Sequence, residues 1–185
     1  NEELGAMHIE IPKRTYVSVP MSIIHAGVWP TFRDEDWLGA YQLKPLPVWD
    51  SARWLTSDLY HGETQKIFYD RSDSNTLHSV TVPRNCAGQM ICVSFHASKT
   101  LGDTQGGAIL HDDPEADKWL RRARFDGRTE GVAPKADSFD MIGWHCYLSP
   151  DVAARLLLKL YSLPRHNAPL PNDDYPELDK MDIFR

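Results

Sequence analysis

The sequence has few cysteines, no long apolar run and no excess of basic residues. Its cysteines are odd in number and form no Cys-x-x-Cys pair: Cys86, Cys92 and Cys146. This pattern argues against a disulfide framework or a closed zinc site and favours a reducing, cytoplasmic setting. No apolar stretch approaches the roughly 18–20 residues of a membrane span, and none resembles a signal peptide. With 20 basic and 26 acidic residues the net charge is −6. We therefore expect a protein that binds neither nucleic acid nor membrane.

Several catalytic motifs are also missing. There is no Walker loop, no G-x-G-x-x-G and no G-x-S-x-G nucleophile elbow. The eight histidines show no His-Glu-x-x-His spacing, and His111-Asp112-Asp113 is typical of a solvated turn. We therefore predict no metal site.

The length of 185 residues suits one domain. Thirteen prolines and eleven glycines indicate many loops and exclude a helical bundle. We divide the chain into an N-terminal arm over residues 1–14, an α/β domain over 15–163 with an inserted β-hairpin region over 55–90, and an extended, proline-rich tail over 164–185.

Local patterns predict alternating strands and helices. Apolar and β-branched runs predict strands over residues 15–19, 30–34, 47–49, 67–69, 79–82, 90–95 and 106–110. Proline and acid signals predict helices over residues 21–26, 113–125 and 150–163. This alternation predicts an α/β fold with a mostly parallel sheet.

One stretch carries the strongest chemical signal. A buried strand ends at Ser94-Phe-His96, turns through Lys99 and returns to a second strand through Gly106-Gly107. A lysine at a strand end beside apolar residues can be desolvated, which favours the neutral amine that attacks a carbonyl as a Schiff-base nucleophile. The hydroxyl of Ser94 can bind a phosphate group. From residue types alone, a surface-loop lysine beside a glycine turn remains the alternative.

The order of residues in this stretch closely resembles the lysine region of the DegT-like sugar aminotransferases, which are fold-type I enzymes dependent on pyridoxal phosphate. Their signature is Ser-Phe-His-x-x-Lys, a short glycine-containing loop, Gly-Gly-Ala and an acidic pair. The resemblance implies that Lys99 is the Schiff-base lysine and that Ser94 binds the cofactor phosphate. A lysine at this position argues against the relatives that carry histidine and act as dehydratases.

The resemblance extends in both directions. Asp50, in Val-Trp-Asp-Ser-Ala-Arg, matches the family's aspartate that pairs with the pyridine nitrogen, and Arg53 stands where glutamine or histidine is usual. His145 and Tyr147 replace the asparagine and arginine of the family's Gly-x-Asn-x-Arg segment, whose asparagine reaches the cofactor phosphate of the neighbouring subunit. The resemblance thus implies the cofactor contacts Asp50, Arg53, Ser94, His96, Lys99 and His145.

Parts of the family pattern are missing. The match covers roughly residues 15–163, without the Gly-Thr/Ser segment that cradles the cofactor phosphate and without the small domain. Only fifteen residues separate Asp34 from Asp50, too few for the usual helix and strand. We expect a compacted version of the family's large domain, or a chain whose missing elements lie on another chain.

Two functional hypotheses follow. In the first, the protein is a pyridoxal-phosphate-dependent transferase that moves an amino group from an amino acid, by resemblance glutamate, to a keto-sugar nucleotide, with Lys99 shuttling the proton. In the second, it is a truncated or split subunit that needs a partner chain or serves a non-catalytic binding role. Either is expected to form a homodimer or a complex. A basic helix face could be solvated or contact an anionic substrate: Lys118, Arg121, Arg122 and Arg124.

Overall fold

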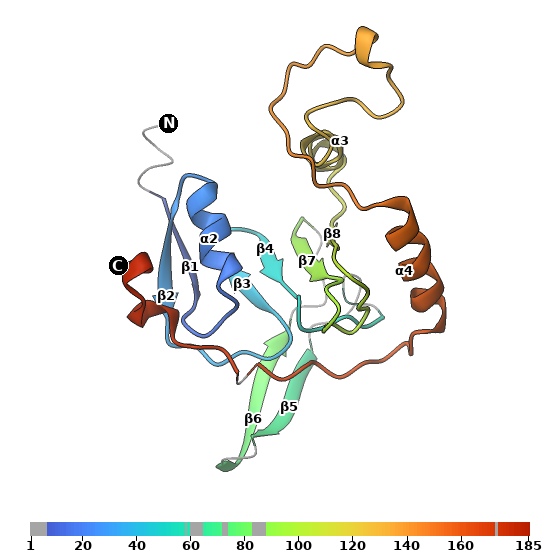
Figure 1. The fold of residues 1–185 in the computed structure, drawn as a ribbon. Coiled ribbons are helices and arrows are strands. Elements are labelled where there is room, and N and C mark those ends of the chain that lie inside the picture. Colours follow the sequence, from blue (N-terminus) through green and yellow to red (C-terminus); the bar gives the residue numbers. More distant parts are fainter. Residues whose placement is uncertain (1–6, 58, 60–64, 72–73, 83–87, 173) are drawn as a thin grey trace.

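A computed structural model of the chain describes residues 7–57, 59, 65–71, 74–82, 88–172 and 174–185. Its helices and strands form a mixed α/β architecture (Figure 1). The sheets are partly parallel, with two parallel and three antiparallel pairings among the described strands. The predicted α/β class is confirmed, whereas the sheet expected to be mostly parallel is only partly so.

The first sheet is a parallel strand pair joined by a helix. Strand β1 (His8–Pro12) pairs with β2 (Trp29–Arg33), and helix α2 (Ser18–His25) connects them. Alternation of polar and apolar residues along β1 places Ile9 and Ile11 in the core. The remaining buried members of this cluster are Ile23, Trp37 and Tyr41.

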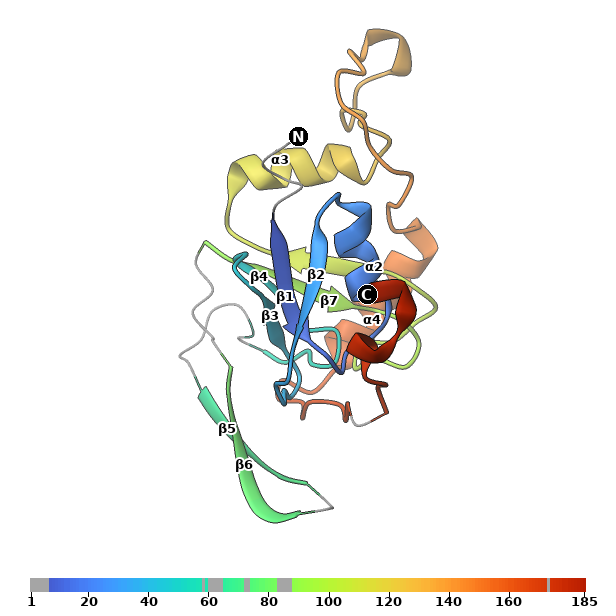
Figure 2. The same ribbon diagram turned by 90° about the vertical axis from the view of Figure 1, so that its left-hand side faces the viewer.

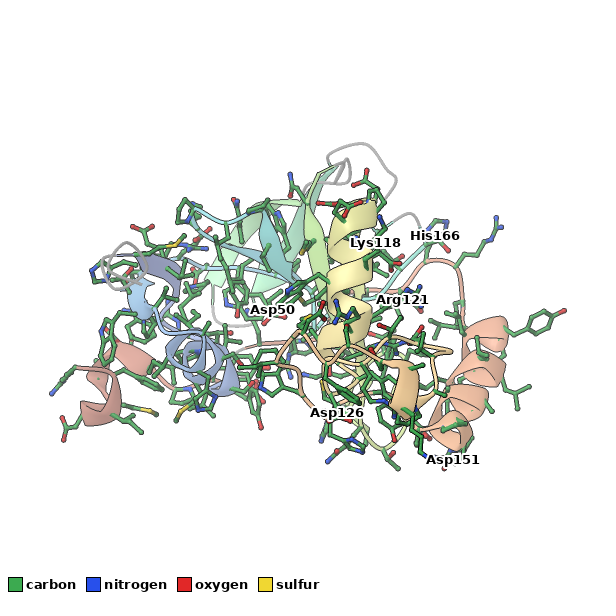
Figure 3. All side chains as sticks on the ribbon, turned by 90° about the horizontal axis from the view of Figure 1, so that it is seen from above. Asp50, Lys118, Arg121, Asp126, Asp151 and His166 are labelled. Carbon is green, nitrogen blue, oxygen red and sulfur yellow. The ribbon has the colours of Figure 1, made fainter. Side chains whose placement is uncertain are left out.

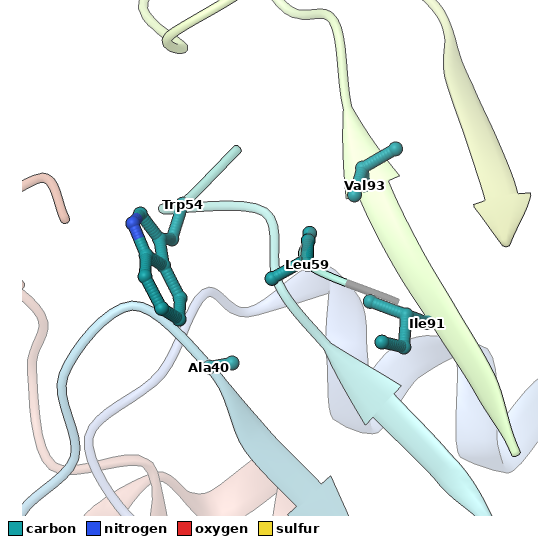
Figure 4. Packing of buried hydrophobic residues seen from close by; sticks show 5 residues of the cluster. All are labelled: Ala40, Trp54, Leu59, Ile91 and Val93. Atoms are coloured by element: carbon teal, nitrogen blue, oxygen red, sulfur yellow. The ribbon is translucent and has the colours of Figure 1, made fainter. Parts of the chain in front are cut away.

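The second sheet has four strands, in the order β3 (Tyr41–Leu43), β4 (Val48–Asp50), β7 (Met90–Ser94) and β8 (Gly107–Leu110). The central pair, β4 and β7, is parallel, and the outer pairings are antiparallel. One face packs against the buried cluster in Figure 4, which consists of Ala40, Trp54, Leu59, Ile91 and Val93. Strand β7 was expected to be buried on both faces, but only alternate residues, Ile91 and Val93, are fully buried.

The predicted hairpin is confirmed. Strands β5 (Gln65–Arg71) and β6 (Ser74–Val82) pair antiparallel and project away from the rest of the chain (Figures 1 and 2). Residues 72 and 73 of the expected turn, and Cys86, lie outside the described residues.

Two helices follow the second sheet. Helix α3 (Pro114–Ala123) begins as predicted, because the Asp113 carboxylate accepts hydrogen bonds from the Glu115 and Ala116 amides at 2.8 and 3.1 Å. Helix α4 (Pro150–Ser162) also begins at its predicted proline. Between them lies the short 3₁₀ helix η1 (Pro134–Ala136).

The strand predicted over residues 15–19 is wrong. Helix α2 begins at Ser18, with Pro20 in its first turn, where a missing amide hydrogen costs no intrahelical bond. Thr15 is instead buried in the core. Its hydroxyl forms a 2.6 Å hydrogen bond with that of Tyr41. Strand β1 in turn lies inside the segment predicted as an N-terminal arm.

The C-terminal residues cross the domain and return to β1. The Leu178 amide donates to the Lys13 carbonyl at 2.8 Å, and the Leu178 side chain is completely enclosed. The short 3₁₀ helices η2 (Leu178–Lys180) and η3 (Asp182–Phe184) end the chain, with the Phe184 ring 5.8 Å from that of Phe32. Among the described residues, no helix is both long and apolar enough to cross a membrane.

Candidate active site

Strands β4 and β7 bring the predicted site residues to one edge of the second sheet. The strands are parallel and pair Asp50 with Cys92, so their carboxyl ends lie side by side. Asp50 ends β4 and Ser94 ends β7. Arg53 and Lys99 follow within a few residues. Carboxyl ends of parallel strands are where α/β proteins commonly bind ligands.

Asp50 is oriented by two hydrogen bonds, one to each carboxylate oxygen, and a third bond links one of its donors to Thr15. One carboxylate oxygen accepts from the Ala52 amide at 2.8 Å, and the other accepts from the Tyr41 hydroxyl at 2.9 Å. The Tyr41 hydroxyl also bonds Thr15. Burial, followed by the Asp50 charge, raises the pKa of Tyr41 well above its usual value, so Tyr41 stays protonated as a donor.

Burial also raises the pKa of Asp50 itself. The Ala52 and Tyr41 bonds and the positive charge of Lys99 oppose this rise but do not cancel it. A buried carboxylate in this condition is stabilised by any further cationic or N–H partner. A ligand with a protonated nitrogen at this edge of the sheet would therefore stabilise the Asp50 carboxylate.

Lys99 is half-buried in the turn after β7, where its amide donates to the His96 carbonyl at 2.8 Å. Burial, and secondly the positive charge of Arg53, lower the pKa of Lys99, whereas Asp50 and Asp174 raise it. The net direction favours the neutral amine, the nucleophilic form. Lys99 and Asp50 each act on the charge of the other.

Ser94 and His96 form the first turn after β7. The Ser94 hydroxyl accepts from the His96 amide at 3.3 Å, and the His96 Nδ1 lies 3.1 Å from the Ser98 hydroxyl. The His96 ring is exposed. Ser94 therefore faces the sheet edge, and His96 lies on the solvent side of the same turn.

A cavity of about 380 Å³ opens between α2 and the second sheet. Its volume is within the range of small-molecule sites. Its side-chain hydroxyl and carboxylate groups belong to Ser18, Ser22, Asp50 and Ser94, and Ala52 also lines it. Arg53, His96 and Lys99 are not among its lining residues.

The structure does not bring His145 to this cavity. Its Nδ1 lies 2.8 Å from an Asp126 oxygen, and its ring packs on Tyr147. Figure 3 shows Asp126 beyond the C-terminal end of α3, apart from Asp50. His145 lines a separate cavity of about 700 Å³ that also includes Gly106 and Gly107.

The basic residues of α3 and its C-terminal end are paired with acids. Lys118 binds Glu115 at 2.6 Å and Arg121 binds Asp117 at 2.7 Å, both exposed (Figure 3). Arg122 pairs with Asp140, and Arg124 pairs with Glu130. These contacts favour the solvated-face interpretation. In the described part of the chain, no cluster of three or more histidine, cysteine or acidic residues could hold a metal ion.

Sequence reasoning missed four residues at this site. Tyr41 and Thr15 orient Asp50, while Asp174 and Tyr175 contact Arg53. Because Arg53 and Asp174 are 121 residues apart, no local pattern indicates their contact. Tyr41, by contrast, could be found once β3 and β4 are recognised, since it pairs directly with Asp50 in the register.

Comparison with known proteins supports the resemblance. Residues 84–169 match the model of the DegT/DnrJ/EryC1/StrS aminotransferase family. This range contains Ser94, Lys99 and His145. No curated protein matches the chain.

Two solved structures share the fold. A protein from Bacillus cereus ATCC 10987, named as a PLP-dependent aminotransferase, is 17% identical, with a TM-score of 0.57 over 87% of this chain and 48% of its own. A DegT DnrJ EryC1 StrS aminotransferase from Brucella abortus is 18% identical, with a TM-score of 0.56 over 87% of this chain and 49% of its own. The chain thus spans about half the length of these structures.

Proposed function

We propose that this protein is a pyridoxal-phosphate-dependent aminotransferase in which Lys99 is the Schiff-base lysine. The observation that carries the proposal is the placement of Asp50, Ser94 and the Lys99 turn at the carboxyl edge of two parallel strands. Asp50 and Lys99 act electrostatically on each other, and burial moves both pKa values toward the neutral forms. The match of residues 84–169 to the aminotransferase family supports the same assignment.

The residues present fit the cofactor. Asp50 would hold the ring nitrogen, whose N–H would be a further positive partner for the buried carboxylate. Ser94 would donate its hydroxyl to the phosphate, and Ala52 would line the same cavity. When bound, the protonated ring serves as an electron sink for a carbanion on the substrate. The contacts expected from the sequence for Arg53, His96 and His145 stay predictions, since none of these residues lines this cavity.

Two side chains of this protein, Asp50 and Lys99, would then hold and transfer the protons. Asp50, held by Tyr41 and the Ala52 amide, keeps a proton on the ring nitrogen. The lowered pKa of Lys99 favours the neutral amine, which is the nucleophilic form. The same amine would act as general base toward the proton on the substrate α-carbon and, once protonated, as general acid. Both roles need an amine whose charge is easily changed, which the lowered pKa of Lys99 supplies.

The proposed substrates follow from the resemblance. The amino donor is an amino acid, in this proposal glutamate, and the acceptor is a keto-sugar nucleotide. The proposed setting is cytoplasmic and the proposed assembly is a homodimer. The donor and the acceptor can be tested by measuring 2-oxoglutarate formed from glutamate with each candidate acceptor, and the assembly by the mass of the protein in solution.

A second candidate is a subunit that needs a partner chain. The chain spans about half the length of its structural relatives, and α4 exposes Leu157, Leu158 and Tyr161. An apolar face of this kind is typical of an interaction surface. In this version, the same Lys99 site works only after assembly.

The decisive experiment is trapping of the cofactor. The purified chain is mixed with pyridoxal phosphate, its visible spectrum is recorded, and borohydride is added before peptide mass spectrometry. The proposed function predicts a new absorbance band and one modified residue, Lys99. Lys99→Ala removes both, whereas the control Lys135→Ala, at an exposed lysine of η1, retains them.

Other outcomes separate the two candidates. A folded chain that gives no band alone, but gives one after a partner is added, favours the partner-dependent subunit. Equal labelling of many lysines, unchanged by Lys99→Ala, contradicts both versions.

A further inference from the structure

Arg53 is held by the C-terminal segment. Its Nη2 donates to an Asp174 oxygen at 2.9 Å, and its guanidinium carbon lies 4.9 Å from the centre of the Tyr175 ring. The side chain is only 13% exposed, and among the described residues its buried Nε has no hydrogen-bond partner. A guanidinium placed in this way is a fixed positive charge with little freedom to move.

The segment that holds Arg53 is itself fixed to the domain. The Leu170 amide donates to the Arg53 carbonyl at 2.8 Å, and the Trp54 indole donates to the Asn167 carbonyl at 2.8 Å. Further along, the Asn172 side chain donates to the Trp37 carbonyl at 2.7 Å. The chain on both sides of Asp174 is therefore anchored.

Arg53 and Lys99 belong to the loops that leave neighbouring parallel strands at the same edge. Three charges act on Lys99, namely Arg53, Asp50 and Asp174. Burial is the largest cause of the lowered pKa of Lys99, the Arg53 charge lowers it further, and the two carboxylates raise it. Asp50 belongs to β4 and Asp174 to the C-terminal segment. The charges that act on Lys99 therefore come from parts of the chain that are distant in sequence.

We propose that Arg53, fixed by Asp174 and Tyr175, is a positioning residue whose positive charge disfavours the ammonium form of Lys99 and so keeps the amine available as the nucleophile. This role rests on the proposed function of Lys99. It departs from the direct cofactor contact expected from the sequence, because the Arg53 Nη2 is already engaged and its Nε is enclosed. The C-terminal segment thereby contributes to the site, because it holds the charge that acts on Lys99.

The test measures Lys99 itself, without the cofactor. The full chain is trace-labelled with formaldehyde and cyanoborohydride over a range of pH, and methylation of the Lys99 peptide is quantified against that of Lys135. Reductive methylation needs the neutral amine, so the midpoint of the profile reports the charge state of Lys99. Formaldehyde replaces pyridoxal phosphate as the probe, so this measurement remains informative if the proposed function fails.

Removing the positive charge of Arg53 and removing the negative charge of Asp174 must shift the methylation midpoint of Lys99 in opposite directions. Arg53→Gln is expected to move the midpoint to higher pH, by about 0.5–1 pH unit, and Asp174→Asn to lower pH. Mere loosening of the fold would instead hydrate Lys99 in both variants and raise both midpoints. Shifts of the same sign, or no shift in Arg53→Gln, therefore overturn the proposal.

Two further variants complete the design. Arg53→Lys keeps the charge and is expected to stay close to the wild-type midpoint. A shift as large as that of Arg53→Gln would contradict a role for charge. Arg128 is the matched control, since it also stacks on a ring, Phe125 at 4.7 Å, and has a buried Nε without a partner. Arg128→Gln is expected to leave the Lys99 profile unchanged. If Arg53→Gln fails to fold by circular dichroism, Asp174→Asn decides, and anything but a shift to lower pH overturns the proposal.

Discussion

Ile9, Ile11 and Leu178 are almost completely enclosed, whereas Leu157, Leu158 and Tyr161 of α4 are 66–94% exposed. The first three belong to what we call the closed region, residues 7–57 with 164–185. The others belong to the open region, residues 111–163. The closed region contains a fully enclosed apolar cluster, although Tyr16, Trp29 and Ile183 at its surface are exposed. The open region presents apolar side chains outward along α4. The proposed site follows the same division, because Asp50 and Arg53 lie in the closed region and His145 in the open one.

The contrast implies that the closed region supplies the rigidity of the site. Asp50 is oriented by Tyr41 and Thr15, which are both buried in the closed region. His145, by contrast, is exposed and pairs with the exposed Asp126. Precise chemistry needs side chains that are fixed by packing. Asp50 is therefore oriented by buried partners within the closed region, whereas His145 lies exposed in the open one.

The largest expected effect is a loss of stability when a buried side chain of the closed region is truncated. Ile11→Ala should lower the free energy of unfolding by about 2–5 kcal/mol, because it leaves a cavity in a fully enclosed position. Leu158→Ala, at an exposed position of α4, should change it by less than about 0.5 kcal/mol. Urea denaturation of the two variants gives the comparison directly. An equal loss in both would mean that the α4 face is packed in solution.

A second prediction concerns acid. Glu177 binds Lys13 at 3.0 Å and Arg14 at 2.9 Å and also pairs with Lys180. The contact with Lys180, and secondly that with Lys13, lower the pKa of Glu177 from 4.5 to about 2. Between these two values the unfolded chain binds more protons than the folded one, so stability is present above pH 4.5 and is lost toward pH 2.

The corresponding measurement is the denaturation midpoint as a function of pH in the wild type and in Glu177→Gln. We expect the wild type to lose stability steeply below pH 4.5 and the variant to show a flatter dependence in that interval. A parallel decline in both proteins would show that other carboxylates control the acid response.

Asp50→Asn separates stability from function. Because burial raises the pKa of Asp50 above its unfolded value, ionising this carboxyl opposes folding, and its contribution is lost as pH rises through the folded pKa. We therefore expect the variant to be as stable as the wild type at pH 7, or slightly more so. Its affinity for pyridoxal phosphate should fall strongly, because the ring nitrogen loses its charged partner. Thermal unfolding and a spectral titration measure the two effects, and a clear loss of stability would contradict this account of Asp50.

The smallest effect concerns thiol reactivity. Cys146 is exposed in the open region, whereas burial and the Asp50 charge raise the pKa of Cys92 to about 11. Iodoacetamide at pH 8 should therefore modify Cys146 well before Cys92, since the thiolate is the reacting form. Peptide mass spectrometry over time gives both rates. Faster alkylation of Cys92 would indicate that the second sheet opens in solution.

Local signals predicted much of the fold, and distant contacts explain the remainder. Asp113 followed by proline correctly predicted the start of α3, because a capping carboxylate acts within three residues. Strand β1 carried a recognisable alternation in His8-Ile9-Glu10-Ile11, but its position near the terminus favoured an arm. The strand over residues 15–19 was predicted from β-branched residues, and the burial of Thr15 against Tyr41 outweighed that propensity.

The site divides in the same way. Asp50, Ser94 and Lys99 could be found from their order along the chain, and the pairing of β4 with β7 brings them to one edge. The surroundings of Arg53 could not, because its partner Asp174 is 121 residues away and carries no motif. The role of His145 stays a prediction.

The closing contacts between β1 and the C-terminal segment also have a consequence for the order of folding. Arg14 and Glu177 are 163 residues apart in sequence, and the Leu178 amide bonds the Lys13 carbonyl beside them. Contacts of such long range form late, since the chain must give up much of its entropy before they stabilise it. Asp174 and Tyr175 lie just before this closure. We expect that a newly made chain assembles β4 and β7 first and acquires the final electrostatic environment of Lys99 only when the two ends of the domain meet.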